Sequence, residues 1–530
     1  MKSRKVEPSG RVVAFLDIGT NSVRLLVVRL NPNHSYTILT RQKQQVRLGE
    51  GEFEEEEILP EAMDRAVTVC KRLGEMARAF ATEEFVAVAT SALREADNQN
   101  KLLHLLRMEA QIDVRVISGR EEARLIYLGV AGATRLGEKK AFFIDIGGGS
   151  TEISIGGEMN YQYLESFKLG ALRLTNLYFP RDFTGPVSKE TYGKIRAHVG
   201  NAIVHSVPEI RRHSPEVAIG SSGTIMNLAE IANRAIRQNP GTAATTLSRK
   251  DLEKVIDLLC SLPLEQRRKI PGINPERADI IIAGAAILEV FMKELSLNII
   301  TVSGRGLQDG LLVDYLSRID EFPLLGELSP RQRSILQLGR SCGINEAHAR
   351  TVTSLVLQLF DSGRELGLHS LSDHERELLE YATFLHDVGS FISYTNHHAH
   401  SYYIIRNSEL LGFDQGEVEF MANLARFHRK KAPRKKDPEV LELDSRQREK
   451  LMILATFLRI GESLDRSHAA LVQHVRFSHV NEVEAGVEIV ARGDCHLELW
   501  GIEGEEKAFE KVFSKKLVFE VLAPGSPPEG

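Results

Sequence analysis

Two short turns carry residue types that bind phosphate, and each directly follows an apolar strand. The turn DIGTNS spans 17–22, and the turn DIGGGS spans 145–150. An aspartate at a strand end can hold Mg²⁺ or a water molecule, while the small residues after it let backbone N–H groups face a phosphate that a Cβ atom would obstruct. One such turn alone is more simply a tight hairpin. The chemistry to look for is phosphate binding beside a hard cation.

The two turns belong to an internal duplication. The segment AFFIDIGGGSTEISIG, which begins at residue 141, aligns with VAFLDIGTNSVRLLVV so that Asp17 matches Asp145 and Ser22 matches Ser150. A third glycine-containing turn, GSSGT, spans 220–224 between a strand pattern and a helix pattern. Three such turns in two similar lobes favour a phosphate cleft between the lobes. The residues of the third turn that we expect at the phosphate are Gly220, Ser222, Gly223 and Thr224.

The elements that must position these turns alternate between strand and helix. Apolar strands such as FVAVATS (85–91) alternate with helical patterns such as PEAMDRAVTVCKRLGEMARAF (60–80), which is typical of α/β layers. A proline-containing stretch at 321–330 leads into purely helical patterns, and short alternating runs follow from Val472. We therefore predict two α/β lobes, an all-α domain and a small α+β domain. The expected boundaries are 11–130, 131–318, 325–470 and 471–523.

The composition is that of a globular protein with no overall attraction to polyanions. Of 530 residues, 42% are hydrophobic and 26% are charged, which excludes disordered and fibrous classes. The 67 basic and 72 acidic side chains give a net charge of −5, so neither nucleic acid nor a membrane is an expected partner. The four cysteines form no C-x-x-C pair, and no apolar run approaches the roughly 18 residues of a membrane span. We expect a cytoplasmic protein.

The motifs together resemble those of the Ppx/GppA family, the exopolyphosphatases and guanosine pentaphosphate phosphohydrolases. The resemblance implies a duplicated actin-like (ribonuclease H-like) two-lobe module of the ATPase superfold. It also implies release of terminal phosphate from inorganic polyphosphate, guanosine pentaphosphate or both, and a homodimer. The helical segment resembles the HD-type third domain of long members. The residues that carry the likeness are AFLDIGTNSVRLLV (14–27), VRLGEG (46–51), VATSALREADN (88–98), VISGREEARLIYLGV (116–130), FIDIGGGSTE (143–152), FKLGALRLTN (167–176), GSSGT (220–224) and SGRGLQDGLL (303–312).

A cation site is expected on the second hairpin. Asp145 and Glu152 lie seven residues apart on its two arms, so the turn between them can bring both carboxylates to one hard cation, Mg²⁺ or Mn²⁺. The resemblance implies the same pair, with Asp17 orienting a water molecule on the metal. It further implies that the phosphate path is lined by Gly147, Gly148, Gly149 and Ser150, faced by Asn21 and Ser22.

A general base is implied by the motif G-x-E-E-A, whose second glutamate is Glu122 here. A carboxylate desolvated in a phosphate-lined cleft has a raised pKa, which suits it to take a proton from water. Alternatively, Glu121 and Glu122 only supply negative charge to the first turn of a helix capped at Ser118. Arg94 either reaches a phosphate or is a surface arginine. Arg173 matches a family motif without an assigned role.

The helical segment contains a possible second metal site. His348, His386, Asp387, His428 and Asp465 fall on separate predicted helices, apart from the adjacent pair, and resemble the H…HD…H…D ligand pattern of HD phosphohydrolases. Imidazole and carboxylate ligands together favour a transition metal. His397, His398 and His400 add ligands for a possible second ion. The alternative is a set of histidines that make hydrogen bonds where helices meet.

A basic run, RFHRKKAPRKKD, spans 426–437 and contains seven lysines or arginines. It is either a solvated loop or the rim of a path for a long polyanion. A kinase or ATPase of the same superfold, with GSSGT at the position that holds adenosine in kinases, remains an alternative function. So does a nucleotide-sensing or scaffold protein dominated by the helical domain. The segment GREEARLIYLGV (119–130) matches the hydrolase branch instead.

Overall fold

The computed structural model describes residues 10–51, 56–134, 136–239, 244–319, 328–434, 436–441 and 443–522. The chain forms two compact units: apart from Asn33–Ser35, which belong to the second, the first runs to Pro330 and the second begins at Arg331. The expected domain boundaries at 325 and 523, and most of the stretch 321–330, lie outside the described residues. Among the described helices, none is both long and apolar enough to cross a membrane.

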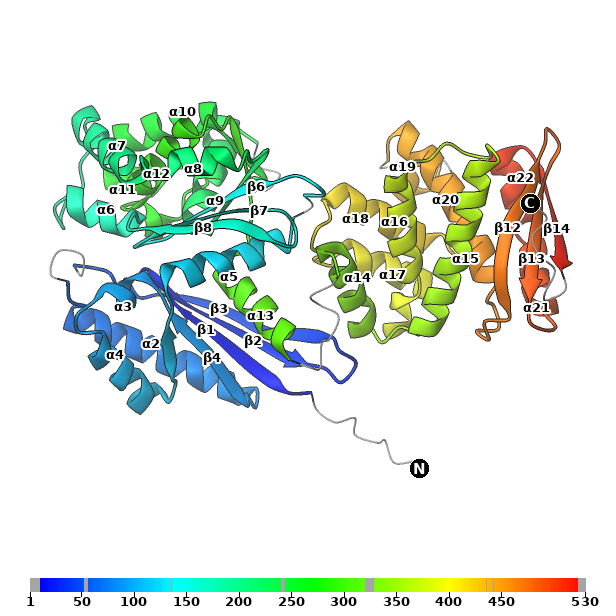
Figure 1. Cartoon of the computed structure of the whole chain (residues 1–530), viewed down its shortest axis with the longest axis horizontal. Coiled ribbons are helices and arrows are strands. Elements are labelled where there is room, and N and C mark those ends of the chain that lie inside the picture. Colours follow the sequence, from blue (N-terminus) through cyan, green and yellow to red (C-terminus); the bar gives the residue numbers. More distant parts are fainter. Residues whose placement is uncertain are drawn as a thin grey trace. The chain divides into compact units, whose positions relative to one another are not determined.

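The first lobe is built on a mixed sheet with strand order β3-β2-β1-β4-β5 (Figure 1). Strand β1 (Val12–Ile18) is buried along its whole length because both faces of the sheet are covered. Its alternate residues face opposite sides, so Leu16 joins one hydrophobic core and Phe15 the other. The other elements of this lobe are β2 (Ser22–Leu30), β3 (Tyr36–Gln45), α2 (Pro60–Ala79), β4 (Glu84–Ala89), α3 (Ser91–Glu95), α4 (Gln99–Leu105), η1 (Leu106–Ala110), β5 (Val114–Val116) and α5 (Gly119–Ala131).

The second lobe repeats this plan with strand order β10-β11-β9-β6-β7-β8. As in the first lobe, a central strand pairs with an antiparallel hairpin partner on one side and a parallel strand on the other. The strands are β6 (Ala141–Ile146), β7 (Thr151–Gly156), β8 (Tyr161–Phe167), β9 (Val217–Ser221), β10 (Thr246–Ser248) and β11 (Ile299–Val302). The helices are α6 (Ala171–Tyr178), α7 (Lys189–Ile203), α8 (Val207–Arg212), α9 (Ser222–Ile231), η2 (Ala232–Ile236), α10 (Arg249–Ser261), α11 (Leu264–Arg267), η3 (Pro275–Arg277) and α12 (Ile281–Glu294).

Helix α13 (Leu307–Arg318) follows the second lobe in sequence but packs against α5 and β1 of the first lobe. Figure 1 shows α5 and α13 side by side. Two glycines permit this close packing. A Cβ atom on Gly310 would lie 1.8 Å from the carbonyl oxygen of Leu125, and one on Gly129 would lie 2.3 Å from that of Gly306. The close packing of α13 thus holds α5, which carries the expected base Glu122, where the two lobes meet.

The second unit consists of helices followed by a small sheet, and both share one hydrophobic core. Phe477 of β12, for example, packs against Phe457 of α20 with ring centroids 6.1 Å apart. The helices are α14 (Pro330–Ser341), α15 (Glu346–Glu365), α16 (Asp373–Phe384), η4 (Val388–Phe391), α17 (His397–Arg406), α18 (Gln415–Arg426), α19 (Pro438–Leu441) and α20 (Ser445–Ser463). The final elements are β12 (Val472–Val480), β13 (Glu484–Ala491), α21 (His496–Glu503), α22 (Glu506–Phe513) and β14 (Lys516–Leu522).

Candidate functional site

Strand register places charged side chains at equivalent positions of the two lobes. In the second lobe Asp145 pairs with Glu152 across β6 and β7. In the first lobe Asp17 pairs with Arg24 across β1 and β2. Because directly opposed residues of antiparallel strands face the same side of a sheet, each pair projects together. The aspartate is therefore common to both lobes, whereas its cross-strand partner is Glu152 in the second lobe and Arg24 in the first.

A cavity of about 90 Å³ lies between the two lobes and is lined by both. All the expected phosphate residues of the first two turns line it, together with the third-turn residues Ser222 and Gly223 and the carboxylates of Glu122 and Asp145. Gly220 and Thr224 do not line it; Gly220 packs against Ile225 and Ile300, and Thr224 is buried against Gly284. The full lining set is Asp17, Gly19, Thr20, Asn21, Ser22, Arg24, Thr90, Glu122, Ile126, Asp145, Ile146, Gly147, Gly148, Gly149, Ser150, Ser222, Gly223, Arg277, Ile280 and Leu307.

The glycine turn of the second lobe is held by the start of α6. The carbonyl oxygens of Gly147 and Gly148 accept backbone N–H groups of Ala171 and Leu172, at 3.0 and 2.9 Å. The Gly149 carbonyl oxygen accepts from Nε of Arg173 at 2.7 Å. In a trans peptide the N–H group points opposite to the preceding C=O group. The N–H groups that follow these carbonyls therefore face away from α6, on the cavity side, where they can bind an anion.

Glu122 and its neighbour Glu121 have different environments. Glu122 is buried, and Oε2 accepts a hydrogen bond from Nη1 of Arg94 at 2.9 Å. Burial raises the pKa of Glu122 to about 7, although the Arg94 guanidinium opposes the rise. Glu121 instead pairs with Arg124 at 2.8 Å, which lowers its pKa. The backbone N–H of Glu121 also donates to the helix-capping Ser118 Oγ at 3.1 Å. Of these two glutamates, Glu122 is thus the one that lines the cavity.

The other carboxylates of the cavity region are buried or partly buried, and desolvation raises their pKa values. The pKa of Asp17 rises to about 6, with Arg24 opposing the rise. The pKa of Asp145 is raised, and that of Glu152 is raised well above its usual value. Asp145 Oδ2 accepts from Ser221 Oγ at 2.5 Å, and Glu152 Oε1 accepts from Ser166 Oγ at 2.8 Å. Glu152 also has a side-chain hydrogen bond with Ser150, which opposes the rise in its pKa.

Two arginines of the cavity, and a lysine that pairs across the sheet with one of them, escaped the sequence analysis. Arg24 and Arg277 line it, and burial lowers the pKa of Arg277 to about 10. Partial desolvation and the guanidinium groups of Arg277 and Arg24 lower the pKa of Lys43 to about 8. Mutually repelling cations of this kind favour binding of an anion such as phosphate. The duplication register could have identified Arg24, which aligns with Glu152, whereas η3 gives no local sequence signal for Arg277.

Two predicted phosphate ligands have specific surroundings. Nη1 of Arg94 donates to Glu122 and, at 3.0 Å, to the carbonyl oxygen of Ile117. These two hydrogen bonds hold the guanidinium beside the expected base. Oδ1 of Asn21 is buried without a hydrogen-bond partner. Arg173 links the glycine turn to α3 through an ion pair with Glu95 at 2.8 Å. Arg173 therefore has a structural role at the glycine turn, which the sequence analysis did not assign.

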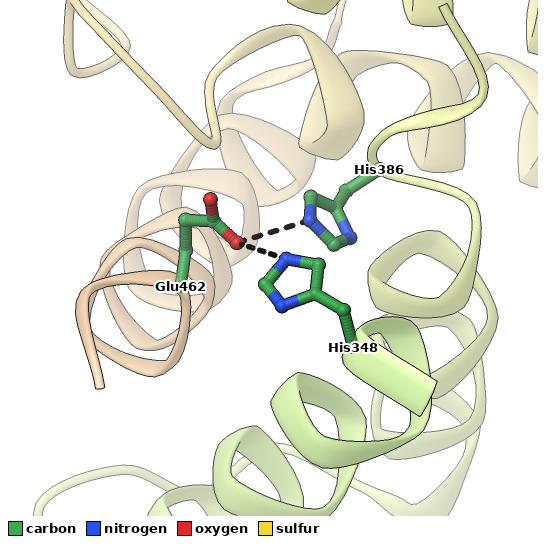
Figure 2. Close-up of side chains that lie close together, drawn as sticks. All are labelled: His348, His386 and Glu462. Atoms are coloured by element: carbon green, nitrogen blue, oxygen red, sulfur yellow. Dashed lines mark ion pairs between the residues drawn. The ribbon is translucent and has the colours of Figure 1, made fainter. Parts of the chain in front are cut away.

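In the helical unit, several predicted metal ligands do come together. Two overlapping groups could each hold an ion: His348, His386 and Glu462 (Figure 2), and His386, Asp387 and His428. His397 joins the second group, with Nε2 at 3.1 Å from Asp387 Oδ1. Asp465 lies behind His348 and contacts its Nδ1 at 2.7 Å, so Glu462 takes the place expected for it. Neither group includes His398, which is buried, or His400, which is partly exposed.

Comparisons with known proteins match both units. Residues 26–319 match the Ppx/GppA phosphatase family, and residues 331–494 match the Ppx/GppA phosphatase domain III. The solved exopolyphosphatase from Cytophaga hutchinsonii is 29% identical, with a TM-score of 0.54, and the match covers 59% of this chain and 99% of that one. A solved exopolyphosphatase-like protein is 25% identical, with a TM-score of 0.52 and coverage of 57% and 97%.

Proposed function

Because the chain belongs to the Ppx/GppA phosphatase family, we propose that it hydrolyses the terminal phosphoanhydride bond of inorganic polyphosphate, guanosine pentaphosphate or both in the cavity between the lobes. Family membership supports the phosphohydrolase class. The observation that carries the proposal is the buried Glu122 carboxylate, with a pKa near neutrality, beside anion-binding glycine turns.

Glu122 would act as general base. A carboxylate with a pKa of about 7 is partly ionised at neutral pH and can accept a proton from water, while Arg94 holds its orientation. The water oxygen forms a bond to the terminal phosphorus as the bond from phosphorus to the bridging oxygen breaks. The products are inorganic phosphate and a chain shortened by one phosphate, and Glu122 returns the proton to solvent or product.

The acids of the second hairpin fit a hard cation. Among the described residues, neither Asp145 nor Glu152 has a lysine or arginine within ion-pair distance, although Glu152 is buried and Asp145 is partly buried. Such carboxylates need a positive ligand, and their oxygens suit Mg²⁺ or Mn²⁺. The bound cation would supply positive charge for the phosphoryl oxygens. Asp17, on the facing lobe, would orient a water molecule from its side of the cavity.

The remaining negative charge of the phosphate chain would be met by this chain's own donors. Backbone N–H groups of Gly148, Gly149 and Ser150 face the cavity, where preorganised donors stabilise charge without reorganisation. Arg24 and Arg277 would bind the following phosphates. Arg24 belongs to the first hairpin and Arg277 to η3, and in this proposal they serve the non-reacting part of the substrate.

Comparing three substrates tests the proposal. Purified protein is incubated with Mg²⁺ and either long-chain polyphosphate, guanosine pentaphosphate or ATP, and released phosphate is measured. We expect kcat/KM for one or both of the first two to exceed that for ATP by at least about tenfold. Phosphate release from ATP alone would contradict the proposal and favour the kinase or ATPase alternative. Release from none of the three would contradict the phosphohydrolase assignment itself.

A further inference from the structure

Four histidines of the helical unit have their Nδ1 atoms fixed by oxygen acceptors. Nδ1 of His386 lies 2.5 Å from the carbonyl oxygen of Thr383, and Nδ1 of His428 lies 2.7 Å from that of Ala425. The same contact joins His397 to Tyr394 at 2.9 Å, and His348 Nδ1 contacts Asp465 Oδ2 at 2.7 Å. Because each acceptor carries no hydrogen, each Nδ1 must carry the proton. In the neutral form of each ring, Nε2 is then left with a lone pair, as in histidines that bind metal.

These Nε2 atoms converge on two carboxylate oxygens. Oε2 of Glu462 lies 3.3 Å from Nε2 of His348 and 3.0 Å from Nε2 of His386 (Figure 2). Oδ1 of Asp387 lies 3.1 Å from Nε2 of His397 and 3.6 Å from Nε2 of His428. The six donors thus divide into two equal sets, each with two imidazoles and one carboxylate.

The spacing within each set matches coordination of a common ion. Ligand atoms about 2.1 Å from a metal are separated by roughly 3.0 Å in octahedral and 3.4 Å in tetrahedral geometry. The separations of 3.0 to 3.6 Å between Nε2 and carboxylate oxygens cover this range. The two sets are adjacent, because Nε2 of His386 lies 3.8 Å from Oδ1 of Asp387. One octahedral ion can accept six donors, but these six do not lie close enough together to share one ion, because each group within reach of a common ion contains three residues.

We propose that the helical unit holds a two-ion transition-metal centre, with one ion on His348, His386 and Glu462 and the other on His397, His428 and Asp387. Two imidazoles and one carboxylate form a ligand set that suits first-row transition ions and leaves coordination positions open. The centre is separate from the oxygen-ligand site of Asp145 and Glu152, because all six donors belong to the second unit.

With the single ring proton on Nδ1, hydrogen bonding does not account for the cluster. The Nε2 atoms of His348 and His386 then face Oε2 of Glu462, and Nε2 of His397 faces Oδ1 of Asp387, as one acceptor against another. The Nε2 atoms of His397 and His428 lie 3.1 Å apart, and with both protons on Nδ1 two lone pairs face each other. Buried polar atoms left in this arrangement are costly, whereas cations between them satisfy every one.

The ions would be accessible to a ligand from outside. The side chains of the four histidines are at most 4% exposed, whereas Asp387 is 27% and Glu462 is 18% exposed. The carboxylates therefore form the side of the centre that faces solvent, and the imidazoles form its floor. Asp465 is a positioning residue in this account, because it orients His348 through Nδ1.

Metal content of the full-length protein tests the proposal. The protein is stripped with a chelator, mixed with Co²⁺ in the presence of excess Mg²⁺ that occupies oxygen-ligand sites, and passed through a desalting column. We expect about two Co²⁺ per chain by elemental analysis, with visible absorption from nitrogen-ligated Co²⁺. Retention of one ion or none by the wild-type protein would overturn the two-ion centre, and this result does not depend on any variant folding.

Matched variants then assign the ions. His348→Gln should lower the retained Co²⁺ from about two to about one, as should His428→Gln, since each removes a ligand from one set. His496→Gln, at an exposed position outside the cluster, should retain two. Thermal unfolding confirms that each variant is folded. A folded His348→Gln or His428→Gln protein with the wild-type content would overturn the assignment.

Discussion

Arg94 and Glu122 form the contact that sets proton affinity in the cavity. Burial favours the neutral carboxylic acid, and the adjacent guanidinium favours the carboxylate. The balance leaves the pKa of Glu122 near 7, where a general base works at neutral pH. Arg94 would therefore tune the proposed base in addition to holding its geometry, whereas the sequence predicted either a phosphate contact or a surface position.

Replacing Arg94 with Gln should shift the pH dependence of activity. Removal of the cation raises the pKa of Glu122 further, so the ionised base forms only at higher pH. The acidic limb of kcat/KM should move toward higher pH, and activity should recover in alkaline buffer. The pH profile of phosphate release measures this shift.

Arg124→Gln is the matched control for this shift, because Arg124 pairs with Glu121 and Asp314 instead. Its acidic limb should stay at the wild-type position. An Arg94→Gln profile that is unchanged, or that moves toward lower pH, would contradict the assigned link between Arg94 and the base.

Individual site residues were predictable from sequence only where spacing fixed their positions. Asp145 and Glu152 could be paired because a tight hairpin brings residues seven apart into opposition. Glu462 was missed and Asp465 chosen, since the two acids lie three residues apart where α20 ends, and composition cannot rank them. Arg277 was missed because the fold alone brings η3 to the cavity.

At the scale of elements, the site depends on a close contact between the turn 147–149 and the start of α6. A Cβ atom on Gly170 would lie 2.1 Å from the carbonyl oxygen of Gly148 and 2.4 Å from the carbonyl carbon of Gly149. Both are backbone atoms, which cannot move aside as a flexible side chain can. Only glycine at 170 therefore allows α6 to hold the turn with its N–H groups toward the cavity.

Gly170→Ala should lower both stability and activity. Steric overlap in a packed region costs about 1–3 kcal/mol, and displacement of the turn should reduce kcat for phosphate release. Chemical denaturation and steady-state kinetics measure the two effects. Gly193→Ala, in the same lobe on α7, has nothing within 4 Å of the added Cβ and should be neutral or stabilising by up to about 1 kcal/mol. Wild-type turnover in Gly170→Ala would contradict the role of this contact.

The strands and glycine turns of both lobes follow from apolar runs and small residues, so local sequence predicted them. The path of α13 does not follow from any local pattern. Its helix is recognisable, but its return to β1 and α5 depends on Gly129 and Gly310, whose significance appears only when the helices meet. Similarly, alternation predicted the C-terminal strands but not that Phe477 shares a core with the helices.

At the scale of the whole molecule, we predict that the basic run 426–437 affects the binding of long substrates. Lys431 and Arg434 pair with Asp437, whereas Lys436 is exposed; Lys435 lies outside the described residues. A polymer that binds through many phosphates releases many counterions, so its affinity falls steeply with salt. Guanosine pentaphosphate has few phosphates to contact and should show a shallower dependence.

A charge replacement tests this role of the basic run. Replacing Lys430, Arg434 and Lys436 with Gln should make the salt dependence of long-chain polyphosphate binding shallower and leave guanosine pentaphosphate binding nearly unchanged. Replacing Lys189, Lys194 and Arg212, three exposed cations of the second lobe, removes the same charge and should not alter the slope. Binding titrations over a range of salt concentrations give both slopes. Equal slopes for wild type and the first variant would identify the run as a solvated loop.

The central claim is that the cavity between the lobes hydrolyses phosphoanhydrides with Glu122 as base, and one comparison of variants tests it most directly. Phosphate release from long-chain polyphosphate and guanosine pentaphosphate is measured for Glu122→Gln and Glu121→Gln proteins whose thermal unfolding matches wild type. Loss of a general base lowers kcat by about 10² to 10⁴. We expect that loss for Glu122→Gln and near wild-type turnover for Glu121→Gln, whose side chain pairs with Arg124. An active Glu122→Gln protein beside an inactive Glu121→Gln protein would contradict the account.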